Sequence, residues 1–120
     1  MSMDNEYIKI ESNKATIYGI GKPKIIEVPE EIIPWLTRSK ILNRILYILI
    51  NHESFKKRLS NPMSLRSLLV YLYAKKKNIP TYIMAKRVNI APEQLYRIER
   101  GLKKDNLYNV IMIQIDLDSS

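Results

Sequence analysis

The chain has 120 residues, and its 46% of apolar residues can form a real core, which argues against wholesale disorder. It contains no cysteine, which excludes disulfides, thiolate metal sites and cysteine nucleophiles, and its single histidine, His52, excludes a histidine-rich metal site. The formal net charge is +8, from 20 Lys and Arg against 12 Asp and Glu. We expect no metal and no other cofactor.

The sequence shows neither a targeting segment nor a membrane-spanning segment. Residues 1–6 are acidic and lack the apolar stretch of a signal peptide. Continuous apolar runs, such as residues 45–50, are far shorter than the roughly 20 residues that cross a bilayer. We therefore expect a soluble, cytoplasmic protein with no membrane partner.

Residues 7–28 predict a small antiparallel β-meander. Residues 7–11 alternate between apolar and polar side chains, and residues 15–20 resume the pattern with β-branched and aromatic residues. Glycine and proline break the chain before residues 24–28, which form a third short run.

Residues 29–33 predict a short helix after the meander. Pro29 suits the first turn of a helix, acidic residues follow it, and Pro34 interrupts the pattern. We expect residues 1–36 to form one unit of a β-meander with a short helix.

Residues 37–60 predict a helical connector. After Thr37 or Ser39 as the N-cap, apolar residues occur on nearly every side of a helix. Such a helix either lies between two layers or contacts a second chain, and we favour a dimer contact. Residues 51–59 predict a separate short basic helix, which Ser60-Asn61-Pro62 ends.

Nearly all of the excess positive charge lies between residues 53 and 104. This segment holds 13 Lys and Arg against 3 Asp and Glu, a net charge of +10, whereas residues 1–52 carry +1 and residues 105–120 carry −3. Such a concentration is typical of a surface that binds a polyanion, and a lysine-rich solvated surface is the alternative.

The segment from Ile79 to Gly101 carries the most informative pattern in the chain. A helix that Ser64 caps precedes it, and it predicts two further helices, over about residues 81–88 and 92–100. Asn89 can adopt the left-handed backbone that a tight turn between them requires, and Gly101 ends the second helix. This is the geometry of a helix-turn-helix.

This segment resembles the helix-turn-helix of the Cro and phage-repressor (Xre-type) family over about residues 64–104. Met84-Ala85 takes the place of the family's Leu-Ala, and Ile98-Glu99-Arg100-Gly101 takes the place of its ending I-E-x-G. The sequence departs from the family pattern at two further positions. Asn89 replaces the turn glycine, and Ala91 replaces the Ser or Thr that caps the second helix.

The resemblance implies that the second helix lies in the major groove of double-stranded DNA. The residues that we expect to contact base edges are Pro92, Glu93, Gln94 and Arg97. Arg97 suits guanine, Gln94 suits adenine and Glu93 suits the amino group of cytosine. Contacts with backbone phosphates are expected from Thr81, Tyr82, Lys86, Arg100, Lys103 and Lys104.

Ordinary structural roles compete with these assignments. Arg97 can pair in solvent with Glu93, one turn earlier, and Glu93 more often stabilises a helix start than reads a base. We expect Trp35 to be a core or interface anchor, and Glu99 to accept a bond from Lys75 or a neighbour.

Residues 105–120 predict a C-terminal strand or helix. Alternation between Ile111 and Ile115 favours a strand that joins the meander, whereas the spacing of Leu107, Ile111 and Ile115 fits a helix. The family resemblance implies further helices after Gly101.

We therefore expect an α+β fold and a sequence-specific double-stranded DNA-binding protein, most simply a homodimeric transcriptional repressor on a palindromic site. One alternative is an antitoxin-like or other protein-interaction module that binds a partner through residues 7–50. A variant of this alternative is an AbrB-like swapped hairpin, which residues Val28–Ile32 resemble. A second alternative is a nonspecific nucleic-acid packaging protein. We do not expect an enzyme, because no spacing brings a nucleophile, a base and an orienting group together.

Overall fold

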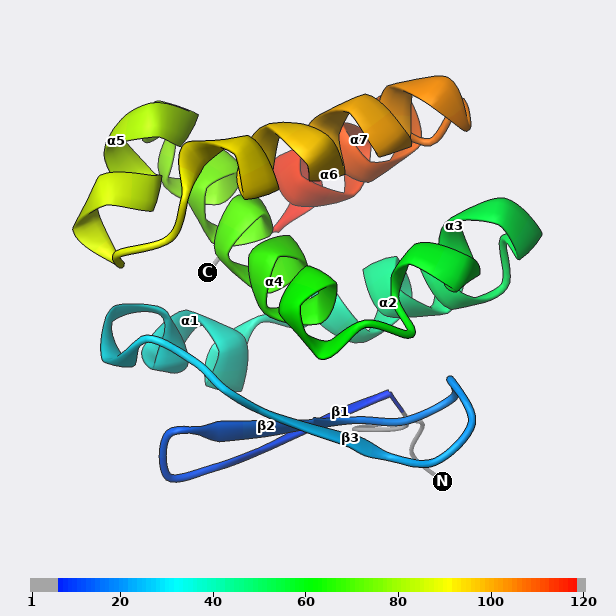
Figure 1. Ribbon diagram of the computed structural model, residues 1–120, viewed down its shortest axis with the longest axis horizontal. Coiled ribbons are helices and arrows are strands. Elements are labelled where there is room, and N and C mark those ends of the chain that lie inside the picture. The colour runs from blue at the N-terminus through cyan, green and yellow to red at the C-terminus, as the bar shows by residue number, and fades with distance from the viewer. Residues whose placement is uncertain (1–6, 119–120) are drawn as a thin grey trace.

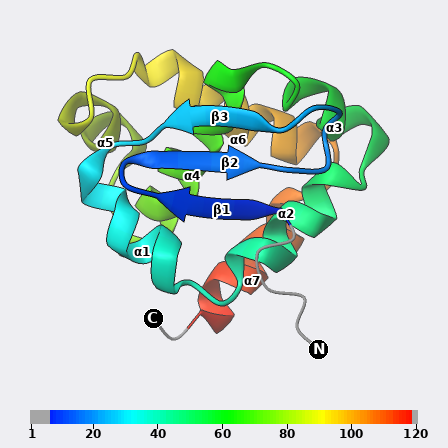
Figure 2. The same ribbon diagram turned by 90° about the horizontal axis from the view of Figure 1, so that it is seen from below.

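The alternating N-terminal segments form a three-stranded antiparallel sheet in the order β1-β2-β3, as predicted. In the computed structural model, which describes residues 7–118, the strands are β1 (Ile8–Glu11), β2 (Lys14–Ile17) and β3 (Lys24–Glu27). Ala15 pairs with Ile26, and both are buried on the same face as Ile17. The other face carries charged side chains, and no described element covers it in Figure 2.

All other regular elements of the described chain are helices, and the fold is α+β. They are η1, a 3-10 helix (Glu30–Ile32), α1 (Ile33–Arg38), α2 (Leu42–Ile50), α3 (Glu53–Arg58), α4 (Pro62–Lys77), α5 (Thr81–Arg87), α6 (Pro92–Lys104) and α7 (Tyr108–Leu117). Figure 1 shows α4 between the sheet on one side and α5, α6 and α7 on the other. None of the helices within residues 7–118 combines the length and the apolarity needed to cross a membrane.

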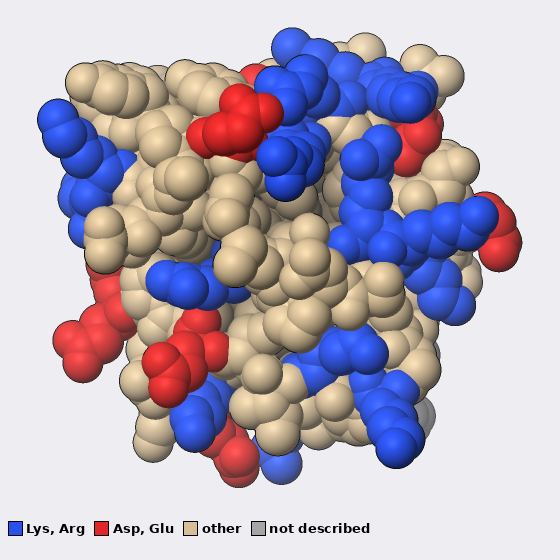
Figure 3. Space-filling view, in the orientation of Figure 1, with Lys and Arg blue, Asp and Glu red and all other residues tan. Residues whose placement is uncertain are grey.

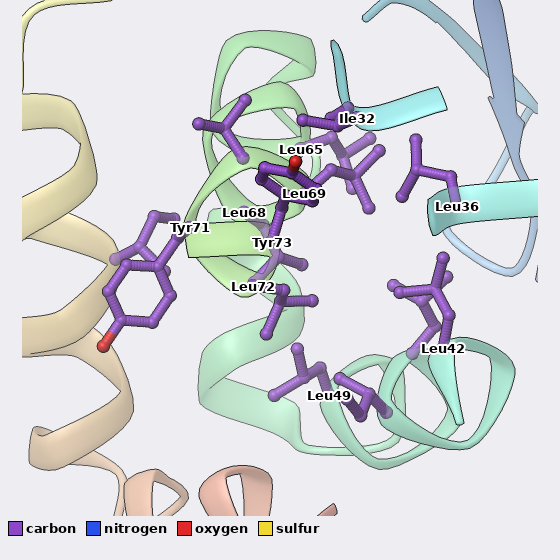
Figure 4. Close-up of a cluster of buried hydrophobic side chains, with 14 of the residues drawn as sticks. Ile32, Leu36, Leu42, Leu49, Leu65, Leu68, Leu69, Tyr71, Leu72 and Tyr73 are labelled. Carbon is purple, nitrogen blue, oxygen red and sulfur yellow. The ribbon is translucent and has the colours of Figure 1, made fainter. Parts of the chain in front are cut away.

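Helix α4 is the central element of the core. Every residue from Ser67 to Ala74 is at most 8% exposed, so the helix is covered on all sides. Figure 4 shows Tyr71 on one side of α4 and Leu42 and Leu49 of α2 on the other. Each fully buried leucine stabilises the fold by about 1.5–3 kcal/mol relative to an exposed one. The sheet and the C-terminal helices therefore share one core.

Helix α2, predicted to be apolar on nearly every side, is covered by its own chain. Ile45, Leu46 and Leu49 are fully buried, and Tyr47 is 55% exposed. Most of the apolar side chains that suggested a dimer contact here are therefore part of the core, and Tyr47 remains exposed.

The predicted N-caps of two helices are wrong. Helix α2 begins after Ile41 without a side-chain cap, because Thr37 lies within α1 and Ser39 belongs to the turn that ends it. Helix α4 begins after Asn61 rather than at Ser64, and the Asn61 side chain accepts a hydrogen bond of 2.9 Å from a backbone amide two residues later. A proline at the first helical position favours this earlier start.

The predicted C-terminal strand is also wrong, because the segment forms the helix α7. Leu107, Ile111 and Ile115 are buried at helical spacing, as the alternative interpretation required. The alternation was misleading because apolar residues also occupy the exposed side of α7, where Ile113 is 55% and Leu117 is 64% exposed. The sheet therefore gains no fourth strand from this segment.

Trp35 anchors α1 in the core, as predicted, and joins it to the end of α7. Its indole Nε1 donates a hydrogen bond of 2.9 Å to the buried carboxylate of Asp118. Lys76 of α4 lies 3.9 Å from the same carboxylate, and Tyr73 packs edge-on against the Trp35 ring. Buried residues from the sheet to α7 form one continuous cluster.

Candidate nucleic-acid interface

Helices α5 and α6 are joined by the tight turn that the sequence predicts. Asn89 has a φ of +60°, in the left-handed region, and the Ile90 amide donates a hydrogen bond of 2.9 Å to the Ala85 carbonyl. Ala85 is fully buried, and its small side chain allows the two helices to approach closely. Pro92 then begins α6.

The inner face of α6 packs on α4. Leu95, Ile98 and Leu102 are at most 4% exposed, and they repeat at helical spacing. This seam fixes the orientation of α6, so that its opposite side faces away from the molecule.

Glu99 has the structural role predicted for it. Its carboxylate accepts a hydrogen bond of 2.9 Å from the Tyr71 hydroxyl and lies 3.5 Å from Lys75 Nζ. Burial raises the pKa of Tyr71 well above its ordinary value, and the bond to Glu99 raises it further. These three residues hold α6 against α4.

The prediction that Gly101 ends the second helix is wrong, since α6 continues to Lys104 and a left-handed Asn106 follows it. Gly101 is buried inside the helix, where a Cβ atom would lie only 2.8 Å from Nε of Arg58. The glycine therefore allows the Arg58 side chain to lie against α6.

The opposite side of α6 is exposed and mostly basic. Six of its exposed residues, which we call the outer face of α6, are Glu93, Tyr96, Arg97, Arg100, Lys103 and Lys104. Glu93 pairs with Arg100 rather than with Arg97, and the hydrogen bond from Arg100 holds the pKa of Glu93 below its ordinary value. Within residues 7–118, Arg97 makes no hydrogen bond or salt bridge.

The four predicted base-contacting residues do not lie together. Pro92, Glu93 and Arg97 are exposed, but Gln94 is half-buried and turned toward α4. The Gln94 side-chain carbonyl accepts a hydrogen bond of 3.3 Å from the Ser67 hydroxyl. Its amide nitrogen lies 2.8 Å from Sδ of Met63. Without a change of side-chain conformation, Gln94 is not available to a base.

The six predicted phosphate-contacting residues divide between α5 and α6. On α5, Tyr82 and Lys86 are exposed, with Lys86 Nζ 5.7 Å from the centre of the Tyr82 ring, and Thr81 is half-buried. The other three, Arg100, Lys103 and Lys104, belong to the outer face of α6.

Sequence reasoning missed the contribution of α3 to this surface. Figure 3 shows Lys and Arg side chains gathered where Figure 1 draws α3 and the C-terminal half of α6. Helix α3 ends in Lys56, Lys57 and Arg58, and the basic run itself was the available signal. In the part of the chain that the structure describes, no group of three or more His, Asp or Glu side chains is arranged to hold a metal.

No family model, curated protein or solved structure matches this chain. The assignment of the surface therefore depends on its own shape and charge. An α-helix of about 10–12 Å diameter fits the major groove of B-DNA, about 12 Å wide, and basic side chains on its outer face can contact bases and phosphates there.

Proposed function

We propose that this chain is a sequence-specific double-stranded DNA-binding protein that acts as a dimeric transcriptional regulator, with α6 in the major groove. The observation that carries the proposal is the basic outer face of α6, which projects from a helix-turn-helix and which no other described helix covers. Arg97, which is exposed in the first half of α6 and has no salt-bridge partner among residues 7–118, is the base-reading residue of this proposal.

The proposed relation to the Cro and phage-repressor family is supported by the roles of the matching residues. Ala85 is buried between the two helices, Asn89 forms the turn, and Ile98 packs on α4. Glu99 bonds to Tyr71 of α4, which corresponds to the first helix of the family's domain.

A palindromic site requires two copies of the chain, and α7 offers a better contact than α2. Ile113 and Leu117 lie one turn apart on α7, and both are more than half exposed. We therefore place the subunit contact on α7, where a Leu117→Lys variant is expected to be monomeric in sedimentation experiments. Half-sites about one helical turn of DNA apart would match such a dimer.

The proposal is tested by fluorescence anisotropy with two duplexes, one selected from a random library and one of random sequence, at two salt concentrations. The selected duplex is expected to bind at least about 1000-fold more tightly. Arg97→Ala is expected to weaken this binding by about 1–3 kcal/mol and to relax sequence preference. Arg38→Ala, which removes an exposed arginine from α1, is the matched control and is expected to bind like the wild type.

Two results would contradict the proposal. Equal, steeply salt-dependent binding to both duplexes would favour a packaging protein. No binding at moderate salt would favour a protein-interaction module.

A further inference from the structure

A pocket of about 300 Å³ lies beside the outer face of α6, between α3, the start of α4 and α6. Three cations line it: Lys57 and Arg58 from α3 and Arg97 from α6. The other lining residues include Ser64 and Ser67, which carry hydroxyl groups, and none of the described residues that line the pocket carries a carboxylate. Its chemistry therefore suits an oxyanion.

Arg58 is held in position on two sides. Its guanidinium carbon lies 5.9 Å from the centre of the Phe55 ring, and Phe55 is fully buried. On the other side it lies against Gly101, where a Cβ atom would come within 3.0 Å of the same carbon. Within residues 7–118, the buried Nε of Arg58 has no hydrogen-bond acceptor. That Nε is enclosed by α6, so the groups left for a ligand are the terminal N–H groups of Arg58, which make no hydrogen bond or salt bridge within the described residues. A guanidinium group that is fixed before binding suits the recognition of a phosphate group.

We propose that this pocket receives one backbone phosphate of the DNA duplex that α6 binds, with Arg58 and Lys57 as its ligands. The inference rests on the proposed function, because Arg97 links the pocket to the outer face of α6. When α6 lies in the groove, α3 faces the flanking strand. Helix α3 then fixes the register of the protein on the duplex, since phosphate contacts position a protein while base contacts specify the sequence.

The first test compares Lys57→Gln/Arg58→Gln with Arg38→Gln/Lys40→Gln, a control that removes the same two residue types from exposed positions outside the pocket. Loss of one phosphate contact makes the slope of log K against log salt less negative by about 0.9. At 0.1 M salt this corresponds to an affinity that is about tenfold weaker. The pocket variant is expected to show both changes. The control is expected to stay within about twofold of the wild type. Thermal unfolding checks that both variants fold.

Gly101→Ala tests the position of Arg58 without removing a charge. The new Cβ displaces the Arg58 side chain from its place against α6, while alanine is the better helix former by about 1 kcal/mol. We expect several-fold weaker DNA binding with a melting temperature that is not lowered. Unchanged DNA affinity in Gly101→Ala would contradict a role for this arginine.

The decisive test replaces each phosphate of the selected duplex in turn with a neutral methylphosphonate. In each half-site, one replacement is expected to weaken the wild type but not Lys57→Gln/Arg58→Gln. The same losses at every position in both proteins would overturn the phosphate pocket and leave the function of α6 standing. Absence of any DNA binding by the wild type would overturn both proposals. Stabilisation by inorganic phosphate, with unchanged DNA affinity in the pocket variant, would show a free-anion site instead.

Discussion

The outer face of the sheet and the outer face of α6 are both exposed and charged, but they differ in how their charges are balanced. On the sheet, Lys9 lies 3.8 Å from Glu11, and Lys14 pairs in register with Glu27 on the next strand. These opposite charges neutralise one another, as is usual for a solvated surface.

On α6, one of the four cations has an acidic partner. Arg100 pairs with Glu93, whereas Arg97, Lys103 and Lys104 have no acidic side chain within salt-bridge distance among the described residues. A surface whose like charges repel one another is unfavourable for the free protein and favourable for a polyanionic partner. The difference between the two faces therefore supports the proposal that the outer face of α6 binds DNA.

The largest expected effect is on DNA affinity, when three lysines are removed from α5 and α6 and the result is compared with removal of three lysines near the sheet. The two variants are Lys86→Gln/Lys103→Gln/Lys104→Gln on α5 and α6, and Lys9→Gln/Lys14→Gln/Lys22→Gln near the sheet, all at exposed lysines. Loss of three phosphate contacts should weaken DNA binding by at least about 100-fold at 0.1 M salt. The sheet variant should stay within about threefold. Equal losses in the two variants would remove the distinction between the faces.

A second prediction is that the inner face of α6 contributes to stability, whereas its outer face contributes to DNA affinity. Glu99→Ala leaves the buried Tyr71 hydroxyl without its acceptor, so we expect the free energy of unfolding to fall by about 1–3 kcal/mol. DNA affinity, measured where the variant is still folded, should change little. Glu27→Ala on the sheet is the control and should alter stability by less than about 0.5 kcal/mol. An unchanged stability in Glu99→Ala, measured by urea unfolding, would contradict this inner contact.

A smaller effect on stability is expected from substitutions of Asn89, in the turn between α5 and α6. Asn89→Ala places a residue with a Cβ and no local hydrogen-bonding group at a φ of +60°, which costs about 1–2 kcal/mol. Asn89→Gly is expected to be close to neutral because glycine adopts this conformation freely. Denaturant unfolding of the two variants measures the difference, and equal stabilities would show that the turn carries no such constraint.

The smallest expected effect is a pH dependence of the folding stability, caused by Tyr71, which lies between α4 and the inner face of α6. The pKa of Tyr71 is raised in the folded protein, so its contribution to stability is complete below the unfolded pKa of about 10 and is lost as pH rises above it. Stability should fall by up to about 1.4 kcal/mol per pH unit from this group. Tyr71→Phe should show a shallower decline between pH 9 and 11. Identical slopes in the two proteins would contradict the assignment.

The parts of the fold that follow from local chemistry could be predicted from the sequence. The strands alternate in polarity, and Asn89 and Pro92 mark a turn and a helix start by their own backbone preferences. Two of the predictions that failed depend on distant residues. From the sequence alone Gly101 suggests a helix end, but in the structure it makes room for Arg58, which lies 43 positions earlier in the chain. The orientation of Gln94 depends on its contacts with α4.

The most direct test of the account is a map of backbone amide chemical shifts in the full chain during titration with the selected duplex. We predict that the shifts change along α6, over residues 92–104, and at Lys57 and Arg58 of α3, and that β1, β2 and β3 stay unchanged. Changes concentrated on the sheet, or no changes at all, would contradict the claim that the outer face of α6 binds DNA.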